Sequence, residues 1–325
     1  ARLRSRDPAD RPVALRLQMA GDARELAVDL QGDAPWQADV TMRLQDLLGR
    51  PAGGLSGDIA LTGLEHMAGG EALALAGRID GQLQPDATGR LGARLVLEAG
   101  GHGRWDTDLA VSVDADGRIR LARLQVDGPD GATLTGDGRL TGPGFDPLGL
   151  AVDLRWQSLA SPALAAVASP AGSLALAGGQ PLAAILDTRL RVPAVPELDL
   201  RAAVDVGADA LRLRDLAVDS AIGSFTASGD IDTGPAGRLA LRGTWADLQR
   251  SGPAPLRAPQ GRFTLTGTRA DWTLAASGDL AVADAGGSVN LDVTGSPTGL
   301  PQLAAEAVTG AARLSLTGQA TWSGQ

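Results

Sequence analysis

The sequence predicts an all-β protein: an elongated, twisted antiparallel sheet curled into an apolar trough, with a few short helices. Apolar and polar residues alternate over much of the chain, as in Leu211–Arg214, and a period of two is typical of a half-buried strand. Glycine is frequent, with 44 in 325 residues, and Asp116-Gly117 is a favoured hairpin turn. Aromatic residues make up only 3% and tyrosine is absent, so small aliphatic side chains must fill the interior. Such side chains suit a thin sheet better than a compact core.

Alternating apolar residues place the strands in chain order. In the first half they predict strands within 13–19, 26–30, 36–44, 59–61, 73–79, 91–97 and 105–113. In the second half they predict strands within 150–156, 174–176, 186–192, 198–206, 239–245, 263–265, 272–274, 289–293 and 314–322. Alanine- and leucine-rich stretches at 158–169, 246–250 and 300–308 are candidate short helices, and 44–50 is a short helix or a loop. Gly21-Asp22 is expected to join the first two strands.

One stretch, residues 211–231, combines a strand, a turn and a second strand that ends on a glycine. Related stretches occur at 119–140 and, shortened, at 311–322. This recurrence predicts one continuous repeat array, with approximate repeats at 1–140, 141–231 and 232–325, in which each repeat packs on its neighbours. We interpret the chain as a middle fragment of a longer protein.

Composition excludes several classes of function. The net charge of −9 and the pI of about 4.8 argue against a nucleic-acid partner, because phosphate binding requires a basic patch. The absence of cysteine excludes disulfides and thiolate metal sites. No run of 18 apolar residues indicates a membrane-spanning helix. His66 and His102 are better interpreted as loop residues than as metal ligands. We therefore expect no enzyme activity, no metal and no cofactor.

Two further motifs have a structural and a functional interpretation. Asp114, Asp116 and Gly117 are similar to the start of a calcium loop, but the later ligands are missing, so a hairpin turn is favoured. The glycine-rich segment 100–105 lacks the third glycine and the helix of a phosphate-binding loop. The six tryptophans are interpreted as packing at strand ends, in preference to a sugar-binding platform.

The segments LAVDLRWQSLASP (150–162), 211–231, GRLALRGTWADLQ (237–249) and GRFTLTGTRADWTLAASGDL (261–280) resemble the translocation and assembly module TamB family. This family belongs to the AsmA-like group of repeating β-groove proteins. The resemblance implies a β-taco fold that bridges the inner and outer membranes of a diderm bacterium, in the periplasm, with the parent protein anchored in the inner membrane. It also implies transport of phospholipid, support of outer-membrane assembly, and a TamA-like outer-membrane barrel partner that meets parts of the parent absent here.

The alternating apolar residues, placed on one concave side, would line a lipid groove. Each methylene that leaves water contributes about 0.8 kcal/mol, so a chain of roughly fifteen carbons gains on the order of 10 kcal/mol. The predicted lining residues are Leu15, Leu17, Val28, Val40, Leu61, Leu75, Leu95, Leu109, Val111, Leu121, Val152, Leu154, Leu176, Leu190, Leu200, Val204, Leu211, Leu213, Phe225, Leu239, Leu241, Phe263, Leu265, Leu274, Leu291, Leu314 and Leu316.

Two other classes of function stay open at this point. One is a periplasmic chaperone or scaffold, whose sheet edge adds strands from outer-membrane proteins during their insertion. The other is a secreted β-helix adhesin, built from parallel coils. Strand topology separates the adhesin from the groove, because only the groove has antiparallel hairpins.

Overall fold

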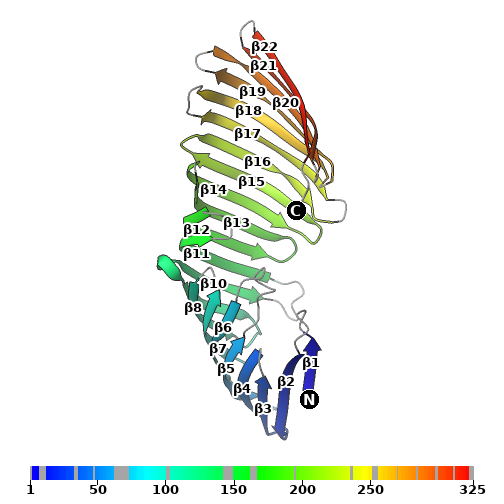
Figure 1. Ribbon diagram of the computed structural model, residues 1–325. Helices are drawn as coiled ribbons and strands as arrows, with labels where there is room; N and C mark the ends of the chain where they lie inside the picture. The colour runs from blue at the N-terminus through cyan, green and yellow to red at the C-terminus, as the bar shows by residue number, and fades with distance from the viewer. Residues whose placement is uncertain are drawn as a thin grey trace. The chain divides into compact units, whose positions relative to one another are not determined.

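A computed structural model describes residues 2–6, 12–32, 36–46, 48–61, 73–99, 103–141, 149–161, 167–193, 195–234, 237–250, 255–268, 270–282, 285–296, 299–309 and 312–321. These residues form β-strands and some of the turns between them, with a single turn of 3-10 helix, η2 (Pro129–Gly131), among them (Figure 1). The chain divides into two units, Ala1–Ser173 and Leu174–Gln325, and the boundary lies inside strand β12 (Val167–Gly178). The repeat limits expected after residues 140 and 231 stay a prediction.

The first unit is an antiparallel meander in which each strand pairs with the next one along the chain. Because consecutive strands are neighbours, tight turns such as residues 84–88 and 114–118 suffice to connect a pair. Its strands are β1 (Arg2–Arg6), β2 (Pro12–Gly21), β3 (Glu25–Gly32), β4 (Trp36–Gln45), β5 (Ala52–Leu61), β6 (Leu73–Leu83), β7 (Gly89–Ala99), β8 (Gly103–Val113), β9 (Ile119–Asp127), β10 (Thr133–Thr141) and β11 (Gly149–Ser161).

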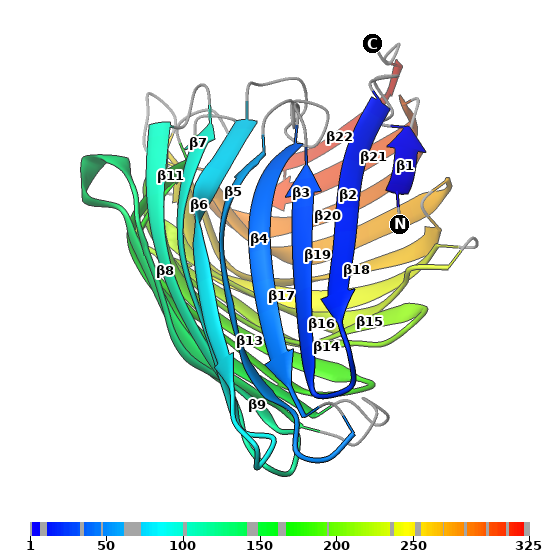
Figure 2. The ribbon, with the colours of Figure 1, turned by 90° about the horizontal axis from the view of Figure 1, so that it is seen from below.

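The second unit repeats this meander without a break in the order of pairing. Long strands in both units are bent along their length (Figure 2). The strands are β13 (Leu182–Val192), β14 (Val195–Val206), β15 (Ala210–Ser220), β16 (Gly223–Asp232), β17 (Arg238–Arg250), β18 (Leu256–Thr268), β19 (Trp272–Val282), β20 (Ala285–Ser296), β21 (Gly299–Thr309) and β22 (Ala312–Thr321).

Each unit is one layer thick. Over the described part of the chain, extensive packing joins consecutive strands, and no second sheet covers either face. The buried residues are small, and no side chain among those described is fully buried. The all-β, antiparallel prediction is therefore confirmed, and a two-sheet sandwich is excluded for the described residues. Apart from Gly237 and Gly295, the buried residues are Ala93, Ala132, Thr188, Ala227 and Val293.

The predicted hairpins are confirmed. Residues 211–231 form β15, a turn and β16, and residues 119–140 form β9 and β10, whereas 312–321 is the single strand β22. β16 continues past Gly229 to Asp232, so the prediction that the second strand ends on a glycine is wrong. The Asp114 carbonyl accepts a bond from the Gly117 amide at 2.9 Å, and Gly117 has a φ of 76°, which glycine adopts without a Cβ penalty.

The predicted helices are wrong. Residues 246–250 belong to β17 and residues 300–308 to β21. Residues 158–161 end β11 and 167–169 begin β12, while 162–166 lie outside the described residues. Of the segment 44–50, residues 44 and 45 end β4, and the described residues after them form a loop, as the loop interpretation predicted. Helix propensity is a weak preference, and in β21 it is overridden because strands on both sides satisfy the backbone hydrogen-bonding groups.

Candidate functional site

Cross-strand register gives each unit one apolar and one polar face. Residues directly opposite each other in a sheet point to the same side. In the first unit, Val40 lies opposite Gly57, Gly57 opposite Ile79, Ile79 opposite Ala93, and Ala93 opposite Leu109. The same register places every predicted lining residue of this unit on one face: Leu15, Leu17, Val28, Val40, Leu61, Leu75, Leu95, Leu109, Val111, Leu121, Val152 and Leu154.

The second unit has the same arrangement. Leu241 lies opposite Gly229 and Leu265, and Leu265 lies opposite Leu274. We assign no face to Leu176, which lies in β12. The other predicted lining residues of this unit share one face: Leu190, Leu200, Val204, Leu211, Leu213, Phe225, Leu239, Leu241, Phe263, Leu265, Leu274, Leu291, Leu314 and Leu316.

A β-bulge keeps the apolar face continuous across β15. Leu213 pairs with Gly229, and the next paired residue is Leu216, which lies opposite Ala227. Arg214 and Asp215 occupy the irregular step between these pairs. Without this step, simple alternation would turn Leu216 toward the polar side, because a shift of one residue exchanges the faces of a strand.

The apolar face is accessible although most of its side chains are half-buried. Adjacent side chains on this face shield one another from solvent. A sheet that curves toward this face would bring them together in this way. Large apolar side chains on this face remain well exposed at Met19 (61%), Leu91 (38%), Val206 (40%) and Leu316 (56%). These four residues lie on separate strands, and together with the half-buried side chains between them they give each unit an apolar face of the kind found at binding surfaces.

Glycines alternate with large aliphatic residues on the apolar face of the first unit. Gly57 lies between Val40 and Ile79, and Gly77 lies between Ile59 and Leu95. A Cβ atom at Gly77 would lie 2.7 Å from the Leu95 Cα atom. These glycines therefore allow close approach of neighbouring strands, a role that apolar alternation alone did not reveal.

Aromatic rings cover glycines in the second unit. The Trp245 indole occupies the space where side chains of Gly261 and Gly278 would lie. The rings of Phe225 and Phe263 stack with centroids 5.0 Å apart and an interplanar angle of 13°. Trp272 in turn covers Gly295, and in the first unit Trp105 covers Gly128. Trp105, Trp245 and Trp272 thus pack across neighbouring strands, which agrees with the packing interpretation for these three tryptophans. This covering of glycine compensates for its missing side chain.

The polar faces carry arginine, aspartate, glutamine and threonine. Arg189 donates to Asp199 at 3.1 Å, and Arg104 donates to Asp106 at 2.9 Å. The Arg104 hydrogen bond lowers the pKa of Asp106, because it stabilises the charged carboxylate. These side chains are solvated, and exposed ion pairs contribute little to stability.

No group of three or more metal-ligating side chains occurs in the described portion of the chain. His66 and His102 lie outside it. Asp114 Oδ1 accepts bonds from the backbone amides of Asp116 and Arg118 at 3.0 and 2.9 Å, which confirms the hairpin interpretation of this motif. None of the described helical segments is long and apolar enough to cross a bilayer.

Comparison of the chain with protein-family models, curated proteins and solved structures found no match. The antiparallel ladders contradict the parallel β-helix alternative, whose coils would pair in parallel. Chemically, the two apolar faces offer non-directional contact to an apolar ligand.

Proposed function

We propose that the chain binds the acyl chains of phospholipids along its apolar faces and carries them between the inner and outer membranes of a diderm bacterium. One observation supports this most strongly: apolar side chains occupy matching register positions on one face of each unit, and no layer covers that face in the described residues. Without a ligand on this face, its apolar side chains would stay in contact with water, which is unfavourable in free energy.

The energetics favour a lipid ligand. Transfer of roughly fifteen carbons from water gives on the order of 10 kcal/mol, and each methylene contributes about 0.8 kcal/mol. Because this contact has no directional component, a chain can move from one strand to the next without breaking specific bonds. The proposal requires neither catalysis nor a cofactor.

The resemblance to the TamB family supplies the cellular part of the proposal. It supports a periplasmic location, a parent protein anchored in the inner membrane, a role in outer-membrane assembly, and a TamA-like barrel partner that contacts other parts of the parent. Direction of transport would then depend on the partners at the two ends.

Photo-crosslinking tests the proposal with two adjacent positions of β17. Leu241 lies on the apolar face and Arg242 on the polar face. A photo-reactive amino acid at position 241, in bacterial cells, is expected to capture phospholipid, and the same residue at position 242 is expected to capture none. Equal capture at both positions would refute the proposal. Capture of unfolded outer-membrane proteins at both positions would favour the chaperone instead.

A further inference from the structure

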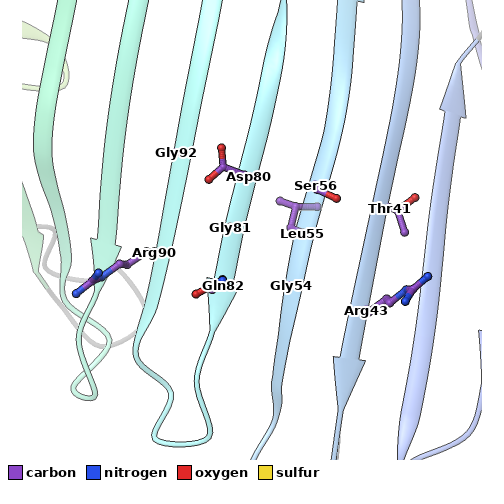
Figure 3. Close-up of a pocket in the computed structure, with 10 residues that line it drawn as sticks. All are labelled: Thr41, Arg43, Gly54, Leu55, Ser56, Asp80, Gly81, Gln82, Arg90 and Gly92. Atoms are coloured by element: carbon purple, nitrogen blue, oxygen red, sulfur yellow. The ribbon is translucent and has the colours of Figure 1, made fainter.

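The polar face of the first unit contains a hollow of about 860 Å³ over strands β4 to β7 (Figure 3). It lies on the side of the sheet opposite the apolar face, so it plays no part in the function proposed above. Glycines at positions 54 and 92 leave part of its floor without side chains. Its polar lining is Thr41, Arg43, Ser56, Asp80, Gln82 and Arg90.

Two neighbouring register rows cross the hollow. The first row runs from Arg43 through Gly54 and Gln82 to Arg90, so its only charges are positive. The second row runs from Thr41 through Ser56 and Asp80 to Gly92, so its only charge is negative. Opposite charges therefore lie in parallel rows two residues apart along the strands.

The charged groups of the hollow are available to a ligand. Over the described ranges, Arg43, Asp80 and Arg90 make no ion pair within 4.0 Å and no side-chain hydrogen bond. By contrast, Arg123 on the same face pairs with Asp108 at 2.8 Å. Arg123 thus has its partner on a neighbouring strand and Arg104 has its partner on the same strand, whereas the hollow separates its charges.

Glycine makes room beside each charge. A Cβ atom at Gly54 would meet only the Gly81 carbonyl oxygen, at 3.7 Å, so the space above Gly54 is open between Arg43 and Gln82. A Cβ atom at Gly92 would lie 3.3 Å from the Asp80 carboxylate, which therefore extends over Gly92. Figure 3 shows Asp80 and Gln82 between the two arginines.

We propose that this hollow binds an extended zwitterion. Its anionic group lies above Gly54, where Arg43 and Gln82 supply hydrogen-bond donors. Arg90, which lies one strand farther away, supplies another through its long side chain. Its ammonium group lies beside Asp80, where Ser56 supplies a further acceptor. Strands are about 4.8 Å apart and two residues along a strand span about 6.8 Å, so the two charges of the ligand are about 8 Å apart. Charge-assisted hydrogen bonds at both ends favour a ligand that carries both charges.

A short peptide with free ends and an amino-bearing phosphodiester share this chemistry. A purely anionic ligand is disfavoured by Asp80, and a purely cationic ligand is disfavoured by Arg43 and Arg90, because like charges repel at these distances. The required length excludes small zwitterions such as glycine, whose charges are too close to reach both rows.

Ligand-observed NMR titration of the whole chain tests the proposal. 6-Aminohexanoate is the zwitterionic probe, glycine is the short control, and hexanoate and hexylamine each carry one of its charges. We expect 6-aminohexanoate to bind more tightly than all three controls. Arg43→Gln and Asp80→Asn are each expected to weaken its binding about threefold to fivefold, as the loss of one exposed charge contact predicts.

Arg155→Gln is the matched control, because Arg155 is an exposed arginine on the same face outside the hollow. It should leave binding unchanged. Asp80→Asn should also increase the affinity for hexanoate, since it removes the carboxylate that repels this anion. Equal binding of glycine and 6-aminohexanoate, or equal effects of the Arg43 and Arg155 variants, would overturn the proposal. Titration of triglycine and of glycerophosphoethanolamine then distinguishes a peptide from a phosphodiester source. Failure here leaves the apolar-face proposal intact, because that face is on the other side of the sheet.

Discussion

The variant Gly261→Ala tests whether the Trp245 ring is held by the glycines beneath it. A Cβ atom at position 261 would overlap the six-membered ring of the Trp245 indole, so the ring must move or the strands must separate. Overpacking of this kind costs about 2 kcal/mol of unfolding free energy. The displaced indole should also become more exposed to water, which shifts its fluorescence emission to longer wavelength.

Gly286→Ala is the matched control in the same unit. A Cβ atom at position 286 meets nothing within 4 Å, and the residue lies in the neighbouring part of the sheet, in β20. It should leave the emission unchanged and raise stability by about 0.5 kcal/mol, because alanine restricts the unfolded chain. Urea unfolding, followed by tryptophan fluorescence, measures both effects. Equal midpoints for Gly261→Ala and the wild type, with unchanged emission, would refute the reasoning.

Three further predictions concern the strands and turns. Asp247 has a φ of 53° within β17, so Asp247→Val should lower the free energy of unfolding by about 1 to 2 kcal/mol while Asp247→Gly lowers it little; the reverse order in urea unfolding would contradict this. Hydrogen bonds from the Thr88 hydroxyl and amide lower the pKa of Asp86. The ionised carboxylate therefore stabilises its turn fully at pH values above the ordinary aspartate pKa, and this stabilisation is lost as the pH falls through the lowered pKa. Thr88→Val should raise the pKa of Asp86 in an NMR titration, and an unchanged value would count against the hydrogen bond as its cause. Leu265→Asp should lower the free energy of unfolding, measured in urea, by about 2 kcal/mol, and Thr264→Asp should lower it by less than about 0.5 kcal/mol. The reason is that only Leu265 lies on the apolar face, so equal losses would argue against the assigned faces.

Apolar alternation predicted the fold class, and which residues of one strand share a face, because both depend on a local pattern. Within each strand, alternation alone puts Leu239 on the same side as Leu241, and Phe263 on the same side as Leu265. That both strands turn these residues to the same side depends on the register, in which Leu241 lies opposite Leu265. Turn residues such as Gly117 were also predictable, because their backbone preference is local. The lining residues that the register brings together were therefore accessible from the sequence, whereas their role in binding lipid stays a proposal.

Features that depend on cross-strand neighbours were not predictable. The segment 300–308 has the composition of a helix, and only its pairing with β20 and β22 makes it a strand. The irregular step after Leu213 and the covering of Gly261 by Trp245 depend on residues that are distant in the sequence. The hollow around Asp80 combines side chains from four strands, so a single sequence gives no signal for it.

Native mass spectrometry of the chain purified from a bacterial host tests the central claim most directly. The wild type and Thr264→Asp are expected to retain glycerophospholipid, and Leu265→Asp is expected to lose most of it while circular dichroism still reports a β-sheet. This result would follow from acyl chains that lie on the apolar face, because Leu265 and Thr264 are adjacent but point to opposite sides. A folded wild-type chain that retains no lipid, or equal retention by both variants, would contradict the claim.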